Sequence, residues 1–145
     1  MANILITNVT NADESIGSGF GGTVTFTLTL TEEVANAVSV GYRTIGGTAT
    51  EIIDFPKSAG TITFAPGTTT QTLDIRVKSD NEEEPDEAFV LELFDPVNAG
   101  FEDDLPVLRS TAFILDDDGI SPSRTLFVGS PVLVEGDGGT RLAEF

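Results

Sequence analysis

Two runs of acidic residues are the part of this sequence with the clearest chemistry. The first is Asp80–Glu87, in which six of eight residues are acidic and none is basic, and the second is Asp116–Asp118. Carboxylates packed together repel one another, and a hard divalent cation bound between them is the usual remedy. The runs therefore point to metal binding, and the alternative is a solvated acidic loop, which is what most charge runs are.

Segments of alternating apolar and polar residues flank both acidic runs. Leu73–Val77 precedes the first run, Phe89–Leu93 follows it, and Thr111–Leu115 precedes the second. Alternation with period two is the pattern of a half-buried strand, so each run should lie where a strand begins or ends. If these strand ends meet at one end of a sheet, the carboxylates converge there.

The composition limits the class of partner. The 145 residues include 24 Asp and Glu but only 7 Lys and Arg, which gives a net charge of −17. This charge argues against nucleic acid and against anionic membrane surfaces. The chain has no Cys and no His, so thiolate and imidazole metal sites are excluded. An oxygen-loving ion remains, calcium first and magnesium second.

Length and hydropathy indicate one domain, or one domain and a fragment. No run of eighteen apolar residues is present, so we expect no membrane insertion. The segment Met1–Ile6 lacks a basic region and a long apolar stretch, so no N-terminal secretory signal is visible.

The pattern along the chain predicts an all-β fold. We expect a loop from Asn8 to Gly22, rich in Gly and Asn, and about seven short strands. Two antiparallel sheets packed face to face explain this pattern best, and a closed barrel is the weaker alternative. The expected strands are Ile4–Ile6, Thr23–Leu30, Val38–Tyr42, Thr61–Phe64, Leu73–Val77, Phe89–Leu93 and Val107–Leu115.

The character of the chain changes after Gly119. Short apolar pieces are followed by Glu135 in a Gly-rich loop and then Gly138-Gly139-Thr140, which matches Gly21-Gly22-Thr23. We interpret residues 1–119 as one domain and 120–145 as a linker and the truncated start of a second repeat.

Several motifs together resemble the Calx-β domain. They are Gly47-Thr48-Ala49-Thr50 with Asp54-Phe55, Gly60–Phe64 with Pro66-Gly67, Asp86-Glu87-Ala88-Phe89, and the closing Asp116-Asp117-Asp118-Gly119. The resemblance covers roughly residues 3 to 119. It implies an immunoglobulin-like antiparallel β-sandwich that binds Ca²⁺ at one end.

The resemblance also implies a set of ligands. Glu14 is the acid of the first loop, with Asp13 as a competitor, and Asp54 is the Asp of the Asp-aromatic pair. Glu82 matches a ligand that binds through its backbone carbonyl. The full implied set is Glu14, Asp54, Asp80, Glu82, Glu84, Asp116, Asp117 and Asp118.

This chain departs from the family pattern at Ser79, where members rich in calcium carry an additional Asp, so we expect fewer ions here. We expect Asp86 and Glu87 to hold the start of the following strand rather than to bind metal. We expect Asp103 and Asp104 to lie on a solvated face.

The sequence suggests two functions and argues against a third. The first is a calcium-binding interaction module in an array, with calcium ions and adjacent repeats of the same chain or another protein as partners. The alternative is an adhesion or spacer repeat that does not require calcium. Catalysis is not expected, because no His and no G-x-S-x-G motif is present. The Calx-β domains that this chain resembles also occur as tandem repeats in large bacterial surface or secreted proteins. The resemblance therefore favours an extracellular or cell-surface location, and a cytoplasmic regulatory domain is the alternative.

Overall fold

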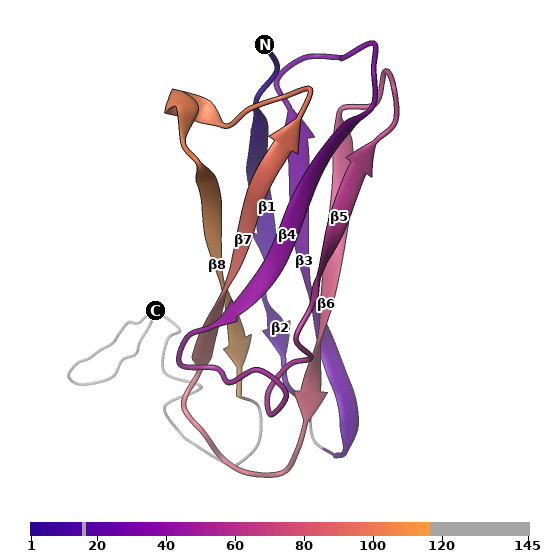
Figure 1. Ribbon diagram of the computed structural model, residues 1–145. Helices are drawn as coiled ribbons and strands as arrows, with labels where there is room; N and C mark the ends of the chain where they lie inside the picture. The colour runs from indigo at the N-terminus through magenta and orange to yellow at the C-terminus, as the bar shows by residue number, and fades with distance from the viewer. Residues whose placement is uncertain (16, 117–145) are drawn as a thin grey trace, which may run out of the picture.

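The computed structural model describes residues 1–15 and 17–116, which form a sandwich of two β-sheets (Figure 1). One sheet has the order β1-β3-β6, with β1 Ile4–Thr10, β3 Gly19–Leu30 and β6 Thr70–Ser79. The other sheet has the order β2-β8-β7-β4-β5. The predicted all-β sandwich is confirmed. The strands of this second sheet are β2 Ala12–Asp13, β4 Val38–Gly46, β5 Ala59–Phe64, β7 Glu87–Val97 and β8 Val107–Leu115.

The core lies between the sheets and is built from alternate residues of the strands. In β3 the side chains of Val24, Phe26 and Leu28 are fully buried, whereas the intervening threonines face outward. Phe89 of β7 meets the Phe26 ring edge to face at 6.2 Å between centroids. This interdigitation of large apolar side chains is the main favourable term in the stability of such a fold.

The first part of the chain differs from the prediction. The expected loop from Asn8 to Gly22 was wrong in its extent, because β1 continues to Thr10 and β3 begins at Gly19. The cause is pairing between strands: past a bulge between Ile6 and Asn8, β1 keeps its ladder with β3, and Gly19 and Phe20 at the start of β3 pair with β6. The extra strand β2 pairs with β8 in parallel, whereas the prediction was antiparallel throughout.

A buried carboxylate crosslinks three strands on the outer face of the larger sheet. Arg43 of β4, Glu92 of β7 and Arg109 of β8 are direct cross-strand partners. Glu92 is 1% exposed, and its two oxygens accept hydrogen bonds from Arg43 Nε at 2.6 Å and Arg109 Nε at 2.7 Å. The bond from Arg109 and then that from Arg43 hold the pKa of Glu92 below its usual range, although burial opposes this. We call these three residues the Glu92 clamp.

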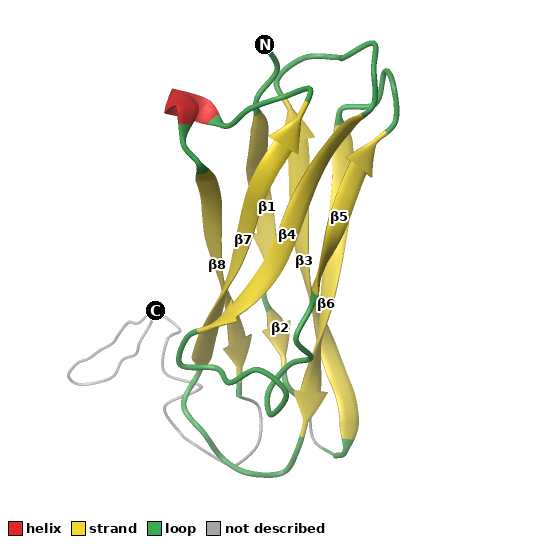
Figure 2. Ribbon diagram, viewed as in Figure 1, coloured by secondary structure: helices red, strands yellow, loops and turns green. Residues whose placement is uncertain are grey.

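Strand direction gathers several loops at one end of the sandwich (Figure 2). The strands β2, β4, β6 and β8 end there, and β3, β5 and β7 begin there. We call this end the acidic pole, because Asp54, the run Asp80–Glu87 and Asp116 lie in its loops. The 3₁₀ turn η1, Glu102–Asp104, lies at the opposite end, between β7 and β8. The described part of the chain contains no helix with the length and apolar character needed to cross a bilayer.

Candidate metal centre

Three carboxylates from two loops and the start of β7 meet at the acidic pole. One oxygen each of Asp54, Glu84 and Glu87 lies within 4.8 Å of the other two. Asp54 is 8% exposed, and the two glutamates are partly buried. Calcium binds oxygens at about 2.3–2.6 Å, so oxygens on opposite sides of one ion are about 4.6–5.2 Å apart. The spacing of this group therefore suits a single divalent cation.

A tight turn before β5 positions Asp54. The backbone N–H of Thr50 donates to Asp54 Oδ2 at 2.6 Å, and the N–H of Asp54 donates to the carbonyl of Thr50 at 2.9 Å. The next residue, Phe55, is fully buried and stacks on Phe89 at 4.3 Å between centroids. The carbonyl of Asp54 also accepts the N–H of Lys78 from β6 at 2.8 Å. Burial of Phe55 thus fixes the position of the Asp54 carboxylate beside it.

The acidic loop between β6 and β7 is folded by its own carboxylates. Asp80 Oδ1 accepts the N–H of Glu82 at 2.8 Å, which closes a turn of the kind that aspartates favour. Asp86 Oδ1 accepts the N–H of Asp116 at 3.0 Å and so connects this loop to the end of β8. Two of the five acids in this loop are therefore engaged with backbone, and the chain is turned so that Glu84 meets Asp54.

The electrostatics of the group reflect this crowding. Burial, followed by the charges of Asp80, Asp54, Glu82 and Asp116, raises the pKa of Glu84. Burial, the charge of Asp54, a hydrogen bond shared with Asp54 and the charge of Glu84 raise the pKa of Glu87 to about 7. In the absence of a cation a proton therefore offsets part of the repulsion between the carboxylates.

Glu14 lies at the same end of the sandwich but enters it from β2. It is 5% exposed, its N–H donates to the carbonyl of Leu115 at 2.9 Å, and its own carbonyl accepts the Ser79 hydroxyl at 2.9 Å. Gly21 allows this approach, because a side chain there would begin 1.7 Å from the Glu14 carbonyl oxygen. Glu14 is thus held between the ends of β6 and β8. The competitor Asp13 is an exposed residue of β2.

Only some of the ligands expected from the sequence lie together in one group. Asp54 and Glu84 belong to the three-carboxylate group, and Asp80, Glu82 and Asp116 are close enough to act on the pKa of Glu84. Asp117 and Asp118 lie outside the described residues, as does the expected second repeat at 120–145. Asp103 and Asp104 are exposed at the opposite end.

Glu87 is not among the ligands expected from the sequence. We expected it to hold the start of the following strand, and it is indeed the first residue of β7. Phe89 and Leu91 face the core, so the period of two puts Glu87 on the same side, one step beyond the apolar layer. This alternation in the sequence could have indicated that Glu87 faces the site.

Known proteins share both the sequence pattern and the architecture. The family model described as the Calx-beta domain matches residues 8–118. The sodium/calcium exchanger Calx of Drosophila melanogaster is 37% identical over 86 residues, which are 59% of this chain and 9% of the exchanger. The chain therefore spans less than a tenth of that relative's length.

Two solved structures superpose on most of the chain. The apo form of the Calx CBD1 domain matches with a TM-score of 0.63 and 25% identity, over 81% of this chain and 98% of that one. CBD12 from CALX1.2 matches with a TM-score of 0.67 and 27% identity, over 80% of this chain and 46% of that one. Since the family model spans well over half of the sequence, this chain belongs to the Calx-β domain family.

Proposed function

We propose that this domain is a calcium-binding module in which an ion held at the acidic pole fixes the loops there. The observation that carries the proposal is the meeting of Asp54, Glu84 and Glu87 oxygens within 4.8 Å, from loops about thirty residues apart in the chain. Carboxylate oxygens in irregular arrangement are the ligands that calcium accepts most readily. A solved relative, CBD12 of CALX1.1, is described as a calcium binding domain.

The role of the chain's own residues follows from their positions. Asp54 is pre-positioned by the Thr50–Phe55 turn, whereas Glu84 lies in a loop held chiefly by Asp80 and Asp86. When bound, calcium supplies the positive charge that a proton on Glu87 supplies otherwise. The acidic loop then becomes tied to the rigid turn, and the acidic pole stiffens.

Other members of the implied ligand set complete the proposed site. Asp80 and Asp116 are additional carboxylates whose charges, like that of Glu82, raise the pKa of Glu84. Glu14, the carbonyl of Glu82, Asp117 and Asp118 stay in the proposal on the strength of the family pattern alone.

Calorimetric titration with calcium of the protein freed of metal, with thermal melting in parallel, tests this proposal. We expect binding heat and a rise in melting temperature, because a ligand that binds only the folded state stabilises it by mass action. Asp54→Asn should weaken both effects, whereas Asp103→Asn, at the opposite end, should change neither. Absence of heat and of a thermal shift at millimolar calcium would reject the proposal.

A second candidate is a spacer repeat that does not require calcium. One observation favours it: the matching Calx CBD1 domain was solved in its apo form, so the sandwich forms without an ion in that relative. Replacing Asp116 and Asp117 by Asn separates the candidates. A spacer should be unaffected or slightly stabilised by relief of repulsion, whereas a calcium module should lose affinity.

The parent protein and its location belong to the same proposal. The similarity to a sodium/calcium exchanger fits the alternative of a cytoplasmic regulatory domain better than the extracellular or adhesion role expected from the sequence. The two CBD12 relatives are longer chains of which this domain covers 46% and 43%. An adjacent repeat is therefore the partner that we propose first. No catalytic step is part of the proposal.

A further inference from the structure

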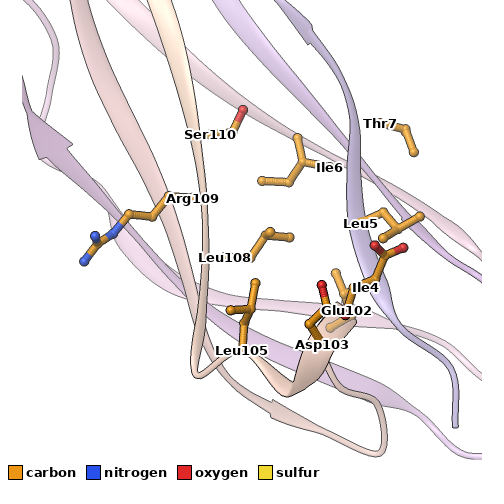
Figure 3. A pocket seen from close by; sticks show the side chains of 10 residues that line it. All are labelled: Ile4, Leu5, Ile6, Thr7, Glu102, Asp103, Leu105, Leu108, Arg109 and Ser110. Carbon is orange, nitrogen blue, oxygen red and sulfur yellow. The ribbon is translucent and has the colours of Figure 1, made fainter.

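An open cleft lies between the two sheets at the end opposite the acidic pole (Figure 3). Its volume is about 340 Å³, and its apolar walls include Ile4 and Ile6 of β1 and Leu108 of β8. In Figure 3 the side chains of Ile6 and Leu108 extend toward each other across the cleft, whereas that of Arg109 extends away from it. Leu105, at the end near η1, is 47% exposed. This volume falls within the range of ligand sites in proteins.

The cleft is bordered by the edge of β8. The strand β2 covers this edge only at Ile114 and Leu115, so residues 107–111 have no strand beside them within the described part of the chain. Phe113 N–H and the Leu115 carbonyl point toward the β2 side, where they meet Asn11 and Glu14. Because backbone groups alternate in direction along a strand, the amides and carbonyls of Val107, Arg109 and Thr111 point the same way.

The end of the cleft near η1 carries negative charge. Glu102 and Asp103 line it, and both are exposed. Asp103 and Asp104 have φ angles of 57° and 53°, a left-handed conformation that non-glycine residues adopt only where the surroundings impose it. The arginine that lines the cleft, Arg109, is engaged with Glu92 through contacts at 2.6 and 2.7 Å. Among the described residues, neither Glu102 nor Asp103 forms an ion pair.

We propose that this cleft binds an extended peptide segment of another protein, which adds a strand to the edge of β8 and places a Lys or Arg against Glu102 and Asp103. The edge supplies backbone hydrogen bonds, the cleft accepts alternate apolar side chains, and the acidic turn selects a basic residue. The strand β2 already pairs with this edge in parallel, so the peptide should run the same way. Its basic residue would then stand at its N-terminal side, next to η1.

Selection from a phage-displayed library of random peptides of roughly nine residues, against the full chain in chelator, tests this inference. We expect enriched sequences with a basic residue followed by alternating apolar residues. Glu102→Lys and Leu105→Lys should each weaken binding of a synthetic copy of the enriched peptide by about tenfold or more. Both positions are exposed, so the substitutions leave the core intact. The matched control is Glu83→Lys, the same charge change at an exposed position of the acidic pole.

Several outcomes would overturn the inference. They are a selection that enriches no sequence, enriched peptides without a basic residue, and peptides that bind the Glu102→Lys protein as well as the original. Amide signals of Val107, Arg109 and Thr111 should also become protected from hydrogen exchange in the complex. Because the selection is done without calcium, its failure leaves the calcium proposal standing, and failure of the calcium titration leaves this inference standing.

Discussion

At the scale of single residues, Ile52 has a conformation that isoleucine rarely adopts. Its φ is 79°, its N–H donates to the Phe55 carbonyl at 2.6 Å, and its side chain is 66% exposed. A β-branched residue in the left-handed region costs about 1–2 kcal/mol, and exposure leaves little packing to offset this cost. The strain is stored in the same turn that positions Asp54.

Replacing Ile52 by Gly should therefore stabilise the free domain. Glycine adopts this φ without strain, and after the greater freedom of glycine in the unfolded chain is subtracted, the gain should be about 0.5–1 kcal/mol. Urea denaturation measures it. Ile53→Gly is the control, since Ile53 is equally exposed but is not among the residues with positive φ, so it should lose stability. If both substitutions raised the stability, or both lowered it, the strain argument would be contradicted.

The pKa of Glu87 predicts how stability depends on pH. That pKa is raised from 4.5 to about 7 in the folded, ion-free protein, so the folded state binds more protons than the unfolded state between these values. Stability from this group is fully present below pH 4.5 and is lost as the pH rises through 7. The ion-free domain should thus melt at a higher temperature at pH 5 than at pH 8.

Comparison with Glu87→Gln isolates this effect, because the amide cannot titrate. Its melting temperature should change less over the same pH range, and an equal change would assign the effect to other groups. Calcium binding near pH 6.5 should also release protons from the original protein, which calorimetry in buffers of different ionisation enthalpy detects.

At the scale of elements, the Glu92 clamp makes β4, β7 and β8 depend on one another. Removing both arginines leaves a buried carboxylate without partners, which typically costs about 3–5 kcal/mol. Replacing Glu92 with Leu and both arginines with Met removes every charge and should cost much less. Chemical denaturation of the Arg43→Ala/Arg109→Ala protein and of the triple variant measures the difference. Equal losses of stability in the two variants would mean that the unpaired Glu92 carboxylate is not the source of the cost.

Strand identity could be predicted from the sequence, but strand extent and partner could not. Val24, Phe26 and Leu28 alternate with threonine, so β3 was evident from local pattern alone. The strands at Asn8–Asp13 depend on distant partners, Thr27 and Ile114, which outweigh the local preference of Gly and Asn for loops. In the candidate site, Asp54 and Glu84 followed from motif and charge. Glu87 did not, because its role depends on which side of β7 faces the acidic pole.

At the scale of the whole molecule, negative charge gathers at the acidic pole in the described part of the chain. The carboxylates of the acidic pole stand close together, whereas two of the seven basic residues are engaged in the Glu92 clamp. Salt screens repulsion between such charges over about 8–10 Å. Raising sodium chloride in chelator should therefore raise the melting temperature, and the rise should be smaller with saturating calcium. A salt effect of the same size in both states would place the repulsion elsewhere.

The direction of the strands also determines how the domain would carry mechanical load. β1 begins at the end where η1 lies, and β8 finishes at the acidic pole, so traction applied between Ile4 and Leu115 runs along the strand axes (Figure 1). Hydrogen bonds between β1 and β3 and between β7 and β8 would then be sheared together rather than unzipped one after another. Such an arrangement resists extension, and an ion at the acidic pole would reinforce the anchorage at one end of the line of force.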